Sequence, residues 1–197
     1  ARGQSLLGAV LVQQSKYDEA RTVLEKALAL QPIASVERFR TQARLAELFA
    51  KMLLKDELAN MAALTRTTAA QMPKMTVTDK ALLAATDARL VCVTQRGTAC
   101  VSQWEKVLAL METTYAKTDS RLTLALEPLV IAYNIVRDLQ RGESVSEKIL
   151  QIERSRPRQN DRRLGSALGD LGSLYNKTNR NSLAEQLQRQ AVALAES

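Results

Sequence analysis

The feature of this sequence that most constrains its fold is an internal repeat with a step near 42 residues. A small or apolar residue returns at the same place in a helical apolar pattern, at steps of 38, 42, 42 and 42 residues: Gly8, Ala46, Ala88, Val130 and Gly172. A period of this length indicates one supersecondary structure that recurs along the chain. A single repeat cannot bury both of its apolar faces, so neighbouring repeats stack and share a continuous core.

The repeat pattern predicts one domain over residues 1–197, with about five repeats at approximately 1–34, 36–73, 79–115, 120–156 and 163–197. The chain starts with Ala1 directly in a helical pattern, and no polar helix follows the last repeat. Because the free ends of such arrays need polar caps, we expect a fragment of a longer protein. The uncapped ends also offer a route to self-association.

Composition places the repeats in the all-α class. The chain has only seven glycines and four prolines, and 46% of its residues are hydrophobic. Ala, Leu, Gln, Glu, Lys and Arg dominate, and these residues lose little rotamer freedom in a helix. Each repeat therefore reads as two helices around a short break. The breaks are expected at Gln14–Asp18, Lys55–Asp56, Gln95–Thr98 and Arg141–Ser144, and Gly8 and Gly172 are expected where the two helices pack tightly.

The first and last repeats resemble the tetratricopeptide repeat (TPR) family. The opening segment places Leu7, Gly8, Ala20 and Pro32 in the slots of the family pattern, with Gln4 where Trp is usual and Leu11 where an aromatic is usual. The closing segment does the same with Leu171, Gly172, Tyr175, Ala184 and Ala191. The long step looks like the kinesin-light-chain style of the repeat. The resemblance implies a right-handed superhelical solenoid of antiparallel helix hairpins.

Composition also argues against an enzyme. The chain has no histidine, which excludes imidazole acid–base steps, Ser-His-Asp triads and HExxH zinc sites. Two cysteines cannot supply the four ligands of a structural zinc site, and no carboxylates cluster in the sequence. We therefore expect no catalytic residues, no metal and no cofactor. No uncharged run reaches the roughly 18 apolar residues that span a bilayer, so this segment is not expected to insert into a membrane.

Cys92 and Cys100 lie on opposite sides of the break at Gln95–Thr98. Antiparallel helices could therefore bring them within disulfide distance near the bend. The alternative is two buried thiols, with Cys100 in a position that requires a small residue. A disulfide would indicate an extracytoplasmic protein, periplasmic or secreted, and free thiols a cytoplasmic one.

The chain is basic, with 28 Lys and Arg against 21 Asp and Glu. The excess gathers at Arg154, Arg156, Arg158, Arg162 and Arg163, between the fourth and fifth repeats. Such a stretch could attract nucleic acid, anionic lipid or an acidic partner, or be a solvated linker, which is the favoured interpretation. Nucleic-acid binding is not expected, because only 4% of the residues are aromatic. Trp104 and the methionines are read as core residues.

The resemblance implies a function in binding. In this family the outward side chains of the first helices line a concave face that holds a partner. By register, the partner-binding candidates are Arg2, Gln13, Arg40, Glu47, Lys51, Arg89, Asn134, Asn176 and Lys177. They suggest a protein or peptide partner with acidic or polar groups. The leading hypothesis is a non-catalytic scaffold domain of a larger protein. The alternative is an effector-sensing domain of a transcription regulator or kinase.

Overall fold

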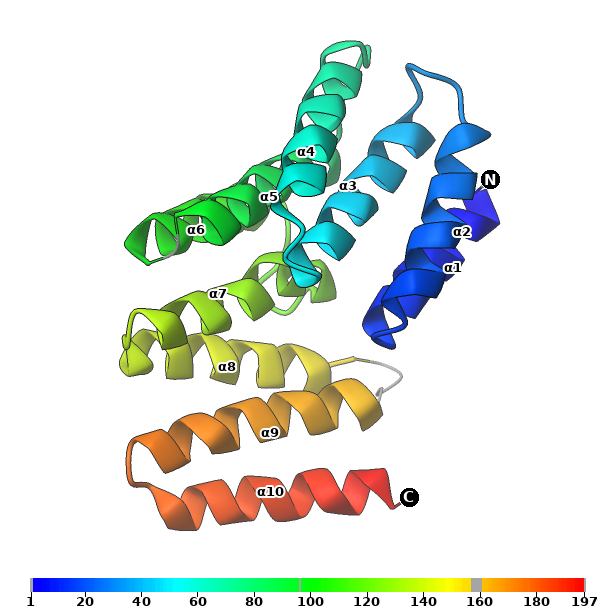
Figure 1. The fold of residues 1–197 in the computed structure, drawn as a ribbon. Coiled ribbons are helices and arrows are strands. Elements are labelled where there is room, and N and C mark those ends of the chain that lie inside the picture. Colours follow the sequence, from blue (N-terminus) through cyan, green and yellow to red (C-terminus); the bar gives the residue numbers. More distant parts are fainter. Residues whose placement is uncertain (1, 96, 157–160, 197) are drawn as a thin grey trace. The chain divides into compact units, whose positions relative to one another are not determined.

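The computed structural model describes residues 2–95, 97–156 and 161–196 (Figure 1), and these form helices and turns without any strand. The all-α class predicted from composition is confirmed. The helices are α1 (Arg2–Gln13), α2 (Tyr17–Ala29), α3 (Val36–Lys51), α4 (Lys55–Ala70), α5 (Val77–Thr94), α6 (Thr98–Glu112), α7 (Thr123–Ile135), α8 (Leu139–Arg154), α9 (Asp161–Lys177) and α10 (Asn181–Ala195), with a short 3-10 helix at Ser120–Leu122.

Consecutive helices form hairpins, and their turns share one backbone device. A residue with positive φ ends the first helix of each pair: Ser15, Leu53, Gly97, Arg137 and Asn179. In four pairs the next backbone N–H donates to the carbonyl five residues before it, at 2.8–3.0 Å. This is the Schellman closure, which satisfies carbonyls that a helix end would otherwise leave unpaired. The small-residue markers lie seven residues before the positive-φ residue in these four pairs, and nine before it in the third.

Two of the expected breaks were wrong. The segment Arg141–Ser144 lies inside α8, and the true turn is Val136–Asp138. Gly142 suggested a turn, yet it is a buried helical residue, and a Cβ added there would lie 3.5 Å from Tyr133 Cβ, an ordinary contact. Similarly, Lys55–Asp56 is the first turn of α4, and the break precedes it. In both cases a non-glycine residue adopts the left-handed conformation, which sequence reading does not anticipate.

The chain divides into two compact units, and each is described by itself. The N-terminal unit comprises residues 2–103, and the C-terminal unit comprises residues 104–196. In the N-terminal unit α1 packs on α3 and α3 packs on α5, so the first helices of successive hairpins form one layer. The second helices α2 and α4 pack on α3 and α5 in turn. In the C-terminal unit α7, α8, α9 and α10 pack in sequence order (Figure 1).

Both units bury the apolar residues that the repeat pattern selects. Leu11, Leu24, Leu45, Phe49 and Leu58 belong to one cluster in the N-terminal unit. Around it and the smaller cluster of Phe39, Ala69 and Met72 pack the partly buried Met52, Met61 and Met75. Trp104 in the C-terminal unit is only 2% exposed. The prediction that Trp104 and the methionines are packing residues is therefore confirmed.

At Gly8 the two helices of the first hairpin approach each other closely. A Cβ added at Gly8 would lie 2.4 Å from Leu24 Cγ, and Leu24 is fully buried. We expect Gly8→Ala to lower the free energy of unfolding by about 1–2 kcal/mol, because overpacking outweighs the gain in helix propensity. Urea denaturation measures the change.

Gly169 and Gly172 provide matched controls for this prediction. A Cβ at Gly169 meets nothing within 4 Å, so Gly169→Ala should raise stability by about 1 kcal/mol. At Gly172 the nearest atom is the Ala184 carbonyl oxygen at 3.5 Å, an ordinary contact, so the tight packing expected there was wrong. If Gly8→Ala were as stable as Gly169→Ala, the close α1–α2 approach would be disproved.

Candidate partner-binding site

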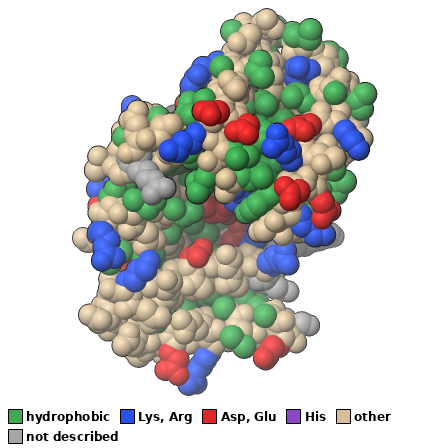
Figure 2. Space-filling view, viewed as in Figure 1, with side chains coloured by type: hydrophobic (Ala, Val, Ile, Leu, Met, Phe, Trp, Pro, Cys, Tyr) green, Lys and Arg blue, Asp and Glu red, His purple; other side chains and the backbone are tan. Residues whose placement is uncertain are grey.

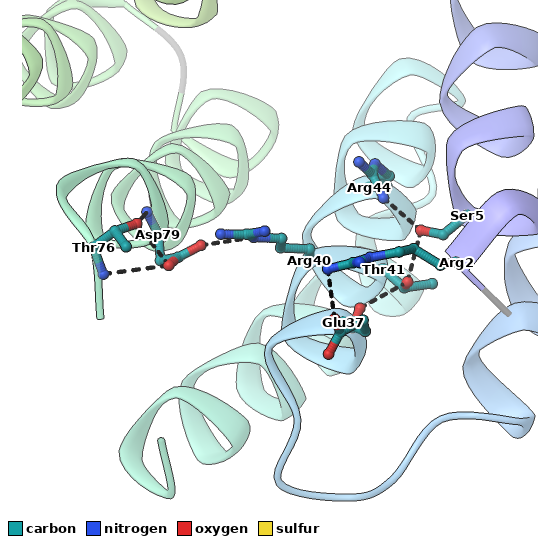
Figure 3. Close-up of polar contacts among 8 residues, drawn as sticks. All are labelled: Arg2, Ser5, Glu37, Arg40, Thr41, Arg44, Thr76 and Asp79. Atoms are coloured by element: carbon teal, nitrogen blue, oxygen red, sulfur yellow. Dashed lines mark hydrogen bonds and ion pairs between the residues drawn. The ribbon is translucent and has the colours of Figure 1, made fainter. Parts of the chain in front are cut away.

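A small polar pocket lies on the first-helix layer of the N-terminal unit (Figure 3). Its volume is about 120 Å³. Helices α1 and α3 supply most of its lining, and the α2–α3 connection adds one residue. The lining residues are Arg2, Ser5, Leu6, Gln31, Glu37, Arg40 and Arg44.

A chain of hydrogen bonds holds Arg44 against this pocket. Thr41 Oγ1 donates to the Glu37 carbonyl at 2.9 Å, so its only proton is used. Ser5 Oγ, 2.7 Å away, must therefore donate to Thr41. That leaves the Ser5 oxygen to accept from Arg44 Nη1 at 2.5 Å. Ser5 and Thr41 are both buried, so their hydroxyls hold the Arg44 guanidinium in place against the floor of the pocket.

Gln31 completes the polar floor. Its Nε2 donates to Thr41 Oγ1 at 3.0 Å, and this orientation follows from the proton count at Thr41. Its Oε1 is buried and has no hydrogen-bond partner among the described residues. A buried acceptor without a donor is destabilising, so the floor of this pocket lowers the stability of the unit.

The pocket carries one positive charge that no carboxylate balances. Arg2 pairs with Glu37 at 3.0 Å, and Arg40 pairs with Asp79 at 2.8 Å (Figure 3). Within the described part of the chain, no carboxylate forms an ion pair with Arg44. Burial and the neighbouring Arg40 charge lower the pKa of the Arg44 guanidinium, against a smaller opposing effect of Glu47. A bound anion beside Arg44 would oppose both effects by favouring the charged guanidinium.

This arrangement is suited to holding a carboxylate. Guanidinium groups form short, charge-assisted hydrogen bonds with carboxylates, often two at once. Leu6, 55% exposed, adds an apolar surface at the edge of the pocket. Among the described residues, no group of three His, Cys, Asp or Glu side chains is placed to hold a metal ion.

Within the N-terminal unit, the predicted partner-binding residues lie at more than one place. Arg2 and Arg40 lie in the pocket. Glu47 and Arg89 pair with each other at 3.5 Å, and Arg89 is only 9% exposed. Burial lowers the pKa of Arg89, with Glu47 opposing, and the side chain lies inside the unit rather than at its surface.

The remaining candidates lie at helix ends. Gln13 and Lys51 are the exposed last residues of α1 and α3. In the C-terminal unit, Lys177 Nζ donates to Asn134 Oδ1 at 3.2 Å, which joins the ends of α9 and α7. Asn176 is exposed beside them. These residues are accessible at the surface but do not line the polar pocket.

Sequence reasoning missed Arg44, Gln31 and Glu37. Arg44 could have been found, because it follows Arg40 by four residues and so lies on the same face of one helix. Gln31 gave no signal, since it stands in a connection between helices. Glu37 belongs to the site through its ion pair with Arg2, which is distant in sequence and cannot be predicted from a local pattern.

The two cysteines are joined. Cys92 near the end of α5 and Cys100 at the start of α6 form a disulfide, with their Cα atoms 4.6 Å apart. The turn between the two helices contains Gly97. The bond therefore links the two helices of the third hairpin at its bend.

The basic stretch between α8 and α9 is partly neutralised within the chain. Glu153, 2% exposed, pairs with Arg156 at 2.8 Å and with Arg163 at 3.8 Å. Arg154 donates to Gln190 Oε1 at 3.3 Å, whereas Pro157 and Arg158 lie outside the described residues. Figure 2 shows Lys and Arg side chains mixed with Asp and Glu over the face in view. These contacts favour a structural role over a nucleic-acid surface.

In the described segments, none of the helices combines the length and the apolar character that crossing a membrane requires.

Fold and site together define a helix-hairpin repeat protein with a polar pocket on the first helices of its N-terminal unit. The family described as Tetratricopeptide repeat matches residues 2–31 and 164–197, so the chain carries tetratricopeptide repeats at both ends. No curated protein matches the sequence. The repeats of this family generally serve protein interaction and are typically non-catalytic.

Solved structures share the fold over nearly the whole chain. BtubC (BKLC) from P. vanneervenii has 15% identity and a TM-score of 0.70, over 98% of this chain and 78% of that one. A putative kinesin light chain from Podosopora anserina, with nearly identical TPR-like repeats, has 18% identity and a TM-score of 0.59, over 98% and 94%. A single-substitution variant of that protein gives 18% and 0.61, over 98% and 93%. The predicted TPR-like solenoid class and its kinesin-light-chain style are thereby confirmed.

Proposed function

We propose that this chain is a non-catalytic scaffold domain that binds an acidic segment of a protein partner on the first-helix layer of its N-terminal unit. The observation that carries the proposal is Arg44. It is a half-buried guanidinium that donates to the buried Ser5 hydroxyl, which Thr41 fixes in turn, and no carboxylate is paired to it among the described residues.

The charge and size of the pocket support a carboxylate as the bound group. Three arginines and the two carboxylates that pair with them leave one positive charge. The cavity of about 120 Å³ suits the end of one acidic side chain or a chain terminus. Leu6 would contact an apolar neighbour of that carboxylate on the partner.

The test is binding to an array of peptide pairs that differ only by Glu or Gln, with free and amidated C-termini. We expect the parent to retain a subset of Glu peptides and to lose their Gln partners. Arg44→Gln should weaken retention about tenfold or more, because a hydrogen bond to a charged group contributes about 1.5–3 kcal/mol. Lys26→Gln on α2 is the control, since it removes one exposed positive charge outside the pocket.

Equal retention of Glu and Gln peptides, or no effect of Arg44→Gln, would refute the proposal. If no peptide is retained but small carboxylic acids raise the melting temperature of the parent, the effector-sensing alternative takes its place. If loss follows amidation alone, the carboxylate is the chain terminus rather than an acidic side chain.

We also propose that the chain folds in an oxidising, extracytoplasmic compartment, on the basis of the Cys92–Cys100 disulfide. Cytosolic thiols are kept reduced, and stable disulfides belong to oxidising compartments. Alkylation in intact cells before lysis should leave both cysteines unmodified. Two alkylated cysteines in the native host would place the protein in the cytosol.

A further inference from the structure

A second surface lies in the C-terminal unit, on the side of the second helices. It is a groove of about 250 Å³ between α6 and α8, with α7 as its floor. Leu108, Leu129 and Val145 give it an apolar base. This groove exceeds the cavity of about 150 Å³ that holds a benzene molecule. It is large enough for one large apolar side chain.

One end of the groove is closed. Tyr133 donates its hydroxyl to Glu105 Oε1 at 2.7 Å, and Arg141 contacts the same carboxylate at 3.2 Å. The Arg141 guanidinium also lies over the Tyr133 ring, 4.9 Å from its centre. Burial and the Glu105 carboxylate raise the pKa of Tyr133 to about 12, so the phenol stays protonated and keeps donating.

The other end of the groove is open. Glu112 on α6 and Lys148 on α8 line it, and both are exposed. Neither has an ion-pair partner among the residues that the structure describes. Each lies seven residues, or about two helical turns, beyond the member of the closed pair on its own helix. One rim is thus acidic, with Glu105 and Glu112, and the other is basic, with Arg141 and Lys148.

The same construction recurs one repeat later. At a step of 42 residues, Glu147, Leu150, Leu171 and Tyr175 replace Glu105, Leu108, Leu129 and Tyr133, and they line a groove of about 560 Å³ between α8 and α10. Tyr175 donates to Glu147 at 3.4 Å. Here the open end differs, because Arg154 and Gln190 stand in place of Glu112 and Lys148 and bond each other at 3.3 Å. The two unpaired opposite charges are specific to the α6–α8 groove.

From this geometry we infer that the α6–α8 groove binds an amphipathic helix of a protein partner. The helix presents a large apolar side chain to Leu108, Leu129 and Val145. A basic residue on one edge of the helix faces Glu112, and an acidic residue on the other edge faces Lys148. Charge complementarity selects this occupant, because a helix with one sign of charge on both edges would meet a like charge on one rim. The inference is independent of the polar pocket around Arg44, which lies in the other unit.

The test uses three synthetic helical peptides of about 15 residues with one apolar stripe. The first has Lys on one edge and Glu on the other, the second has Glu on both edges, and the third has Lys on both. Fluorescence anisotropy at low salt should show the parent binding the mixed peptide about tenfold more tightly than either other peptide. The preference should shrink at high salt, since the rim charges are exposed.

Two rim variants should move this preference in opposite directions. Glu112→Lys should favour the peptide with Glu on both edges, and Lys148→Glu the peptide with Lys on both. Glu196→Lys, exposed at the end of α10, controls for net charge and should leave the order unchanged. Ala109→Arg, at an exposed position lining the groove, should abolish binding of all three peptides.

The inference is overturned if the parent binds none of the peptides or binds them equally. It is also overturned if Ala109→Arg has no effect, because the peptides would then bind elsewhere. Arg44→Gln should not change these affinities, so failure here and failure of the carboxylate pocket can be told apart.

Discussion

Replacing Asp79 with Ala is expected to lower the free energy of unfolding by about 3 kcal/mol, the low end for breaking a buried ion pair. Asp79 is 1% exposed and accepts hydrogen bonds from Arg40 Nε at 2.8 Å and Thr76 Oγ1 at 2.7 Å. It is also half of the capping box that starts α5. The change removes all three interactions, and the loss stays near the low end because Arg40 remains partly exposed.

Two milder variants separate the charge from the cap. Asp79→Asn keeps an acceptor for Thr76 and should cost about half as much, whereas Thr76→Ala should cost about 1 kcal/mol as a lost helix cap. Urea denaturation with circular dichroism ranks the three. If Asp79→Ala lowers the free energy of unfolding by less than Thr76→Ala does, the ion pair with Arg40 contributes nothing.

The same carboxylate gives the effect a pH dependence. Burial alone would raise the pKa of Asp79, but the hydrogen bonds from Arg40 and Thr76 outweigh burial and hold the pKa below its usual range. A depressed native pKa means that the stabilisation is complete above the unfolded pKa of about 3.9 and is lost as pH falls through the native value. The difference in free energy of unfolding between the parent and Asp79→Ala should therefore stay constant from neutral pH to about 5 and become smaller below about pH 4.

The helix pairs could be predicted because their signals are local. Gly8, Ala46, Val130 and Gly172 stand at one register position, and at Gly8 the side chain of Leu24 leaves no room for a Cβ. All four lie seven residues before the turn, although the first step is shorter than the others. A pattern of apolar residues at helical spacing requires no knowledge of distant parts of the chain.

The turns and the polar pocket could not be read in the same way. Arg137 takes a positive φ at the turn closed by the Schellman bond, while Gly142, the obvious turn residue, is buried inside α8. The pocket depends on pairs such as Arg2 with Glu37 and Arg40 with Asp79, which lie 35 and 39 residues apart. Such pairs exist only after stacking. Arg89 shows the opposite case, because its charge suggested an exposed position, yet the side chain is only 9% exposed and pairs with Glu47 of α3.

Reducing the Cys92–Cys100 disulfide is expected to lower the free energy of unfolding by about 2.5 kcal/mol. The bond closes a loop with a sequence separation of eight residues, and in the chain-entropy account a loop of this size removes about that much freedom from the unfolded state. Urea denaturation with and without reductant measures the difference. Cys92→Ala with Cys100→Ala should match the reduced parent and should not respond to reductant. Ala is the right replacement, because Cys100 is 6% exposed and a serine would bury a hydroxyl there.

The bond lies at the bend of the hairpin whose register differs from the other four. Its marker Ala88 lies nine residues before the positive-φ Gly97, against seven in the other four hairpins, yet three residues separate the two helices in every pair, so the extra residues lengthen α5 rather than the turn. In the chain-entropy account the disulfide stabilises this hairpin by restricting the unfolded chain. Thiol titration in denaturant without reductant should find no free cysteine. If two thiols titrate and reductant changes nothing, the third hairpin is held by packing alone, and the proposed oxidising compartment loses its support.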